Sequence, residues 1–356
     1  MKNSAVYLIV LVIVLLFSST VVNAQTPTMK IGGYVQNWLI LREGTEGIAN
    51  APALYTSGFR IRRARLGFKG DISEMFNYNV LLEFAGSQNI LLDFASTVKI
   101  DPAFNITVGQ FIAPTQMYET STISSANTEC LEISDIASTI YTTMNLDSYR
   151  DVGLMASGNI DMVKYGAYFG NGRGRFNYAS RTGIISRKFG DGLIGGRIDI
   201  EPLKNIIVGG HYARNNQESV DSTSSGLSSK KLDRQTFSAL VNVSDASGML
   251  IRAEYAGGKN KDNPAKESSF KGYYILFGYK FNPQIQGVLR YEWMEVKTGG
   301  LVTGEHQTLV LGGTYFFMKE EKEIAKLQLN YFARTETSPT PSVDNDLLLL
   351  GLQIKF

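Results

Sequence analysis

The side chains that could carry catalytic chemistry are few in this sequence. It contains two histidines, His211 and His306, and one cysteine, Cys130. Neither histidine lies in a recognisable motif with a serine nucleophile, and neither has metal-ligand spacing to another residue. A single cysteine excludes an intrachain disulfide. We therefore expect that the protein is not an enzyme and that it has no metal site and no cofactor.

Charged side chains are more informative, because many recur on one face of segments in which polar and apolar residues alternate. Such alternation separates the two faces of a β-strand. If the polar faces line a common interior, that interior acts on solutes through its charge. The basic candidates are Arg63, Arg65, Lys69, Lys99, Arg197, Arg252, Lys280, Arg290, Lys326 and Lys355. The acidic candidates are Glu83, Asp93, Asp199, Glu254 and Glu292.

This assignment makes the interior basic on balance. The alternative is that the charges only neutralise one another within the wall. Arg252 with Glu254 and Arg290 with Glu292 have the spacing for such pairs, because residues two apart share one face of a strand.

The long segment 112–148 has the opposite charge. It has no lysine or arginine, and its acids are Glu119, Glu129, Glu132, Asp135 and Asp147. If it folds into the interior, we expect its acids to face basic wall residues such as Arg63 and Arg65. The resulting transverse field favours small polar solutes over apolar ones. The alternative is an external loop whose acids are solvated.

These side chains have to be positioned by strands. In residues 235–244, for example, Phe237, Ala239 and Val241 alternate with polar neighbours, which a helix would spread over its apolar side. The predicted strands are 29–41, 58–70, 75–86, 89–101, 104–111, 149–160, 163–170, 193–201, 205–214, 234–245, 248–257, 270–281, 284–297, 304–318, 323–334 and 346–356. We therefore predict an all-β fold, a transmembrane antiparallel up-and-down β-barrel of about 16 strands.

The connections between the predicted strands differ in length. Those after even-numbered strands are short, such as 102–103, whereas most after odd-numbered strands are long and polar, such as 112–148 and 215–233. Two odd connections, near Ser87 and Gly299, are short and break the pattern. Short turns at one rim and long loops at the other are typical of outer-membrane barrels, whose turns are periplasmic and whose loops are extracellular.

The first 24 residues have the pattern of a secretory signal peptide. Lys2 gives a positive start, Ala5 to Phe17 form an uncharged apolar run, and Val22-Asn23-Ala24 is a small-residue cleavage pattern. The run is shorter than the about 20 residues of a membrane-spanning helix. We expect residues 1–24 to be removed and residues 25–356 to form the barrel. The formal net charge of +2 gives no support for nucleic-acid binding.

Three sequence motifs resemble the phosphate-selective porin O and P family. Arg62 to Gly70 (RRARLGFKG) is similar to the arginine-bearing second strand of that family. Gly109-Gln110-Phe111, followed by Pro114 and Ser124-Ser125, resembles its fifth strand running into the third loop. Arg150 to Met155 (RDVGLM), with Gly158, resembles the strand after that loop.

The resemblance covers most of Gly32 to Phe356, and Phe356 on an alternating strand looks like the assembly signal of outer-membrane barrels. It implies a sixteen-stranded barrel, a trimer, and a third loop folded into the lumen. It does not carry over phosphate selectivity, because Ile112 stands where the family often has lysine.

Together these features predict an outer-membrane porin that allows passive diffusion of small polar or anionic solutes, phosphate among them. The expected partners are outer-membrane lipid, two further copies of the chain and the barrel-assembly machinery. Two alternatives stay open: an assembly barrel without an open pore, and a membrane-embedded hydrolase with a serine–histidine pair on the outer wall.

Overall fold

The computed structural model describes residues 26–42, 57–86, 90–123, 129–144, 146, 149–175, 192–223, 226–262, 266–319, 322–337 and 345–356. The predicted signal peptide, residues 1–24, and Asp147 of the acidic segment lie outside these ranges. Within them, no helix is both long and apolar enough to cross a membrane.

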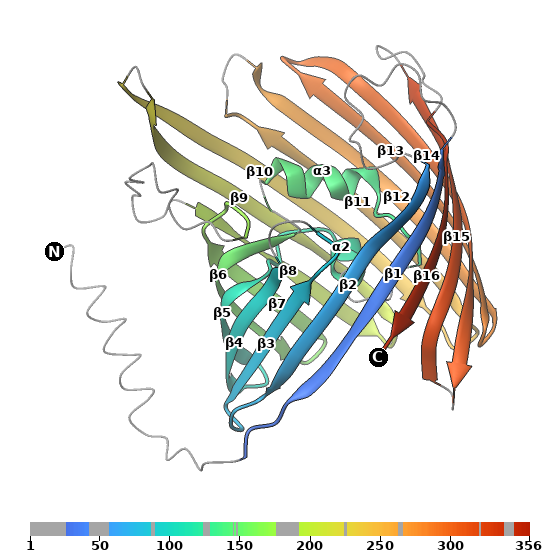
Figure 1. Ribbon diagram of the computed structural model, residues 1–356. Coiled ribbons are helices and arrows are strands. Elements are labelled where there is room, and N and C mark those ends of the chain that lie inside the picture. The colour runs from blue at the N-terminus through green and yellow to red at the C-terminus, as the bar shows by residue number, and fades with distance from the viewer. Residues whose placement is uncertain are drawn as a thin grey trace.

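Sixteen antiparallel strands of the described chain form one closed barrel (Figure 1). Each strand pairs with its neighbours in sequence, and β1 pairs with β16 to close the ring. The strands are β1 (Lys30–Arg42), β2 (Gly58–Asp71), β3 (Phe76–Glu83), β4 (Leu91–Asp101), β5 (Phe104–Ile112), β6 (Arg150–Ile160), β7 (Val163–Gly170), β8 (Gly192–Leu203), β9 (Ile206–Thr223), β10 (Gly226–Ser244), β11 (Met249–Asn260), β12 (Ser268–Asn282), β13 (Ile285–Thr298), β14 (Leu301–Lys319), β15 (Lys322–Thr337) and β16 (Leu347–Lys355). The predicted all-β, sixteen-stranded barrel is confirmed.

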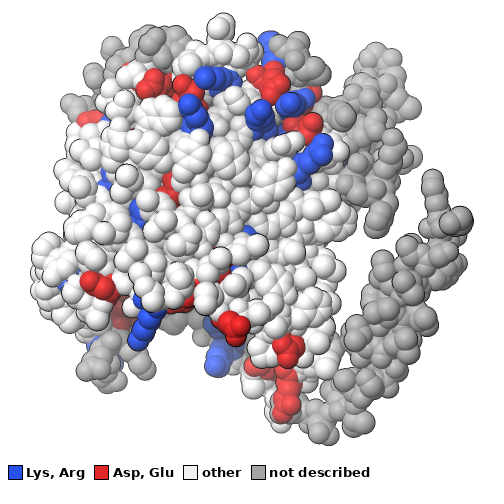
Figure 2. Space-filling view, turned by 180° about the vertical axis from the view of Figure 1, so that it is seen from behind, with Lys and Arg blue, Asp and Glu red and all other residues white. Residues whose placement is uncertain are grey.

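Alternation along each strand sends apolar side chains outward. On β12 the exposed Ile275, Phe277 and Phe281 alternate with the buried Tyr274 and Leu276, which face the interior. Figure 2 shows the result on one face of the molecule: a broad, mostly uncharged band, with charged residues gathered toward its upper and lower edges. Such a band is the outer surface that a membrane requires of a barrel.

One predicted loop is largely strand. Residues 215–233 were expected to be a long polar connection, but β9 and β10 continue into them and pair from Ile206↔Val243 to Thr223↔Gly226. The polar composition hid these strands, because a hairpin that projects beyond the membrane band needs no apolar outer face.

The barrel closes at a tight seam between its first and last strands. Gly33 and Phe356 exchange two backbone hydrogen bonds, at 3.0 and 3.1 Å. A side chain at Gly33 has no room, because a Cβ there would lie 2.1 Å from the carbonyl oxygen of Arg65. Gly33 thus permits the close approach of β1 to both of its neighbours.

The acidic segment after β5 folds inside the barrel. It contains two helices, α2 (Tyr118–Ile123) and α3 (Asp135–Thr143), and α3 lies within the ring of strands in Figure 1. The helix α3 begins at Ser134, whose hydroxyl accepts a hydrogen bond from the backbone N–H of Ala137. We call the described part of residues 113–149 the inner loop.

Candidate functional site

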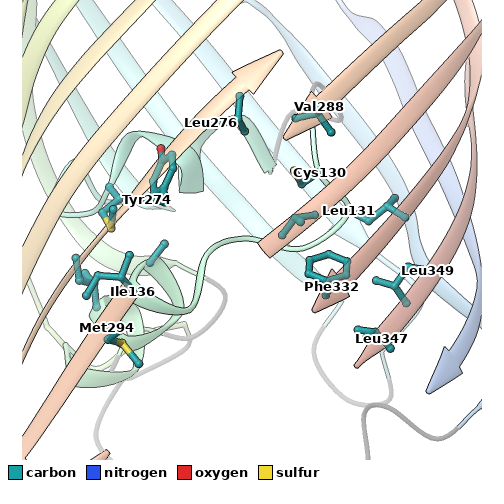
Figure 3. Packing of buried hydrophobic residues seen from close by; sticks show 14 of the residues in the cluster. Cys130, Leu131, Ile136, Tyr274, Leu276, Val288, Met294, Phe332, Leu347 and Leu349 are labelled. Atoms are coloured by element: carbon teal, nitrogen blue, oxygen red, sulfur yellow. The ribbon is translucent and has the colours of Figure 1, made fainter. Parts of the chain in front are cut away.

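Apolar side chains of the inner loop pack against the inside of the wall. Leu131 and Cys130 lie near Phe332 and Leu349, and Ile136 lies beside Tyr274 and Met294 (Figure 3). Burial of such side chains stabilises each by roughly 1.5 to 3 kcal/mol relative to an exposed position.

A second apolar cluster lies across the lumen from the first. Here Met144 and Leu146 from the end of the inner loop pack with Phe111, Tyr168 and Leu193 of β5, β7 and β8. The inner loop therefore contacts both sides of the barrel and narrows the lumen.

Two ion pairs fix the acids of the inner loop to the wall. Glu119 lies 2.6 Å from Arg290 on β13, and Glu129 lies 3.1 Å from Arg252 on β11. All four side chains are largely buried, and such pairs are strong when further hydrogen bonds satisfy them. Glu119 also accepts two hydrogen bonds from Ser134, at 2.7 and 2.9 Å.

Wall carboxylates bind the backbone of the inner loop. Glu292 accepts a hydrogen bond from the N–H of Asp135 at 2.8 Å, and Glu254 accepts one from the N–H of Tyr118 at 3.0 Å. The ring of Tyr118 also contacts two guanidinium groups, 5.3 Å from that of Arg197 and 5.1 Å from that of Arg252.

These contacts correct one expectation about the inner loop. Glu119 and Glu129 do not face Arg63 and Arg65; they bind arginines of β13 and β11 instead. Of the predicted acids, Glu132 is near the arginine-rich strand β2, with its carboxylate 3.9 Å from Arg62.

Two ion pairs within the wall were suggested, Arg290 with Glu292 and Arg252 with Glu254, and only the first forms. Arg290 lies 2.6 Å from Glu292, so that pair forms alongside the contact with Glu119. Arg252 instead binds Glu129 and the side chain of Asn242, while Glu254 is hydrogen-bonded by Ser238 and Tyr274. The structure thus places Arg197, Arg252 and Arg290 where they hold the inner loop.

An arginine-rich strip lies on the inner face of β2. Arg65 pairs with Glu83 at 2.8 Å, and Arg63 donates to the hydroxyl of Tyr34 at 3.2 Å. A bulge in the pairing with β1 skips Arg62, so that two successive residues face inward. Arg62, which simple alternation puts on the outer face, lies over the buried ring of Trp38 at 5.1 Å.

Arg150 is a further buried charge that the sequence did not single out. Its side chain has no exposed surface and lies 2.6 Å from Asp93. Arg150 begins β6 just after the inner loop, and alternation along that strand assigns it no inward position. Only the fold brings it to Asp93 on β4.

Lysines line the short-turn end of the lumen. A cavity of about 470 Å³ is lined by Lys30, Lys69 and Lys355, with Asn79 at its side. Lys30 and Lys69 are direct cross-strand neighbours on β1 and β2. Like charges placed directly opposite each other are destabilising unless something offsets them.

The remaining predicted lysines differ in their surroundings. Lys99 pairs with Asp71 at 2.5 Å, and Lys280 lies over the ring of Phe316 at 5.2 Å. Lys326 is buried, with 2% of its surface exposed.

A second cavity of about 470 Å³ lies at the short-turn end against β6 to β9. Asp161, Asp199 and Glu201 line it together with Lys164 and Lys204. The two cavities therefore differ in charge: the one beside β1 and β2 is lysine-rich, and the other is slightly acidic.

Both histidines lie on inward-facing positions. His211 is buried and its Nδ1 lies 2.8 Å from Ser238 Oγ, but that hydroxyl donates its proton to Glu254 at 2.9 Å. His306 lies on the same face of β14 as the buried Thr308 and Val310. The hydrolase alternative requires a serine–histidine pair on the outer wall, and neither histidine is placed to form one. In the described residues no cluster of three or more potential metal ligands occurs.

A closed sixteen-stranded barrel, an apolar outer band and a narrowed, charged lumen define the class: this is an outer-membrane β-barrel with the fold of the porins. Residues 51–186 match the family described as phosphate-selective porin O and P, as the motifs indicated. No curated protein sequence matches the chain.

Solved porin structures share the fold at low sequence identity. The trimer form of OmpT of Vibrio cholerae is 11% identical, with a TM-score of 0.64 and coverage of 93% of this chain and 100% of that one. The outer membrane channel DcaP of Acinetobacter baumannii is 12% identical, with a TM-score of 0.66 and coverage of 93% and 97%. An anion-selective porin from Comamonas acidovorans is 12% identical, with a TM-score of 0.63 and coverage of 93% and 100%.

Proposed function

We propose that the protein is a passive diffusion pore for small polar solutes with a mild preference for anions, phosphate among them. The observation that carries the proposal is the lysine-rich cavity beside β1 and β2. Lys30 and Lys69 oppose each other there, and Lys355 lines the same space. A passing anion would offset the repulsion between the first two lysines, whereas a cation would add to it.

The inner loop supports this direction of selectivity. Its acids Glu119 and Glu129 are bound to Arg290 and Arg252, so they do not offset the lysines at the short-turn end. The preference stays mild because the second cavity presents Asp161, Asp199 and Glu201 to the same lumen. The family match at residues 51–186 agrees with the solute class, as does the anion selectivity of the structural neighbour from Comamonas acidovorans.

The reversal potential across a planar bilayer in a salt gradient tests the proposal. We expect the unmodified protein to prefer anions, and the variant Lys30→Gln/Lys69→Gln to lose most of that preference. The matched control is Lys259→Gln/Lys271→Gln, which removes two charges from the outer wall and leaves selectivity unchanged. Strong cation preference in the unmodified protein would sink the proposal.

One observation favours the alternative of an assembly barrel without an open pore. The inner loop packs apolar side chains on both sides of the lumen, as a plug would. Liposome swelling with sugars of graded size separates the two functions. A pore admits the smaller sugars and swells the vesicles, whereas a plugged barrel leaves all of them unswollen.

We further propose that residues 1–24 are a signal peptide removed on export, that the barrel-assembly machinery inserts the chain, and that it forms a homotrimer. The trimer form of the structural neighbour OmpT supports the last point. The mass of the purified protein in detergent, measured by native mass spectrometry, tests both the cleavage after Ala24 and the presence of three copies.

A further inference from the structure

A groove of about 300 Å³ lies in the wall of the barrel near the long-loop rim, across β9 to β13. Its lining includes two exposed aromatic residues, Tyr212 and Phe237, the buried Phe270, and four charged residues, Lys259, Lys271, Glu295 and Lys297. Tyr212 and Phe237 are among the exposed apolar side chains of the outer wall, so the groove opens toward the membrane and not toward the lumen.

Strand register explains the hollow. One row across the wall runs from Phe237 through Gly257 and Lys271 to Glu295, each the direct partner of the next. Gly257 leaves an empty position between the aromatic ring and the lysine. A Cβ there would lie 3.0 Å from the ring of Phe237. The next row toward the rim contains Lys259, so the lysines lie on two adjacent levels.

The groove lies at the depth of lipid headgroups. Below Lys271, the outward positions of β12 are apolar or aromatic from Tyr273 to Phe281. This stretch is about 26 Å along the strand, or roughly 20 Å across the membrane at the usual tilt, which is close to the apolar band of a barrel. Lys271 therefore lies just beyond the edge of the hydrocarbon. Its position over the ring of Trp293, at 5.6 Å, is typical of this interface.

The charge of the groove is positive. The carboxylate of Glu295 lies 3.5 Å from the ammonium group of Lys271 and 3.2 Å from that of Lys297. It therefore keeps the two ammonium groups close together. Among the described residues Lys259 has no acid within ion-pair distance. Three ammonium groups and one carboxylate leave a net charge of +2 beside an apolar band. That combination suits a ligand with phosphate groups attached to acyl chains.

We propose that this groove binds a phosphorylated glycolipid of the outer leaflet of the membrane. The phosphates contact Lys259, Lys271 and Lys297, and the acyl chains lie along Phe237 and Tyr273 below them. The proposal concerns the outer wall alone and is independent of what passes through the lumen.

Native mass spectrometry in detergent tests the proposal with diphosphorylated lipid A as the probe. We expect the unmodified protein to retain the lipid. The variant Lys259→Gln/Lys271→Gln/Lys297→Gln should bind it about tenfold more weakly or worse, because three charge-assisted contacts are lost. Dephosphorylated lipid A should bind the unmodified protein as weakly as the diphosphorylated form binds the variant.

The matched control is Lys30→Gln/Lys69→Gln/Lys355→Gln, which removes the same charge from the lumen and should bind lipid A normally. Equal binding by the outer-wall variant, or equal binding of the dephosphorylated lipid, would overturn the proposal. A heat-dependent shift of the band on a denaturing gel checks that both variants are folded barrels. The six lysines are at least partly exposed, so their substitution is not expected to prevent folding.

Discussion

Arg290 lies between two carboxylates, those of Glu119 at 2.6 Å and Glu292 at 2.6 Å, with 1% of its side chain exposed. Replacing it by glutamine leaves two buried acids without their counter-charge. We expect Arg290→Gln to lower the free energy of unfolding by about 3 to 5 kcal/mol, the usual effect of breaking a buried pair. Urea unfolding in lipid vesicles measures the difference.

The control for this substitution is Arg214→Gln. Arg214 pairs with Asp233 at 3.5 Å and has 48% of its side chain exposed, so its pair is a surface one. Such pairs contribute about 0 to 1 kcal/mol. Equal effects of the two substitutions would contradict the role assigned to Arg290.

Cys130 gives a prediction about pH. Burial raises the pKa of its thiol to about 12, the negative charges of Glu119 and Glu129 act in the same direction, and Arg290 opposes them. Because the thiolate is the reactive form, the folded protein should react very slowly with iodoacetamide at pH 8 and faster as pH rises. In urea the pKa returns toward about 8.5, and the reaction at pH 8 should become fast.

An exposed cysteine provides the comparison for Cys130. The variant Cys130→Ser/Ala246→Cys carries its thiol on an exposed turn between β10 and β11. It should react at the same rate in the folded and unfolded states. Rapid labelling of folded wild-type protein at pH 8 would contradict the buried position of Cys130.

At the scale of elements, the seam between β1 and β16 can be tested with two adjacent glycines. A Cβ at Gly33 would lie 2.1 Å from a backbone oxygen, whereas a Cβ at Gly32 would lie 3.4 Å from the oxygen of Phe356. We expect Gly33→Ala to reduce the fraction of folded, heat-modifiable barrel on a denaturing gel. Gly32→Ala should leave that fraction near the wild-type value, and the reverse order would refute the argument.

The strands could be predicted because each one carries its own signal. A wall that faces lipid on one side and water on the other imposes period-two alternation on every segment within the membrane. The extension of β9 and β10 to Thr223 and Gly226 carries no such signal, because it lies beyond the membrane band. Sequence pattern therefore predicted the part of each strand that the membrane constrains.

The site could be predicted only in part. Alternation suggested inward positions for Arg252 and Arg290, but it could not pair them with Glu129 and Glu119, which lie more than a hundred residues away. The inward position of Arg62 was missed because a bulge shifts the inward–outward alternation of β2 by one residue. Such a shift exchanges the two faces of a strand.

At the scale of the whole molecule, buried ion pairs join the inner loop to the wall of the barrel. Removing both acids, in Glu119→Gln/Glu129→Gln, breaks the two ion pairs that join the loop to Arg290 and Arg252. We expect a larger and noisier single-channel conductance, because the loop no longer narrows the lumen as tightly. Single-channel recording in planar bilayers measures the change.

Glu267→Gln is the control for this loop experiment. Glu267 pairs with Lys261 at 3.6 Å on the exposed surface, with both side chains more than 40% exposed. Its loss should leave conductance unchanged. A double variant that conducts as the wild type does would show that apolar packing alone fixes the loop.

The seam between β1 and β16 also bears on the order in which the barrel forms. Its pairs, such as Tyr34↔Lys355, join residues about 320 positions apart, the longest-range contacts in the sheet. Contacts of this range form late, since the intervening chain must first be ordered. Until then β1 and β16 both present unpaired backbone groups. Such groups pair with other chains in water and have no hydrogen-bond partner in lipid. The growing sheet therefore needs a chaperone that shields two free edges at once.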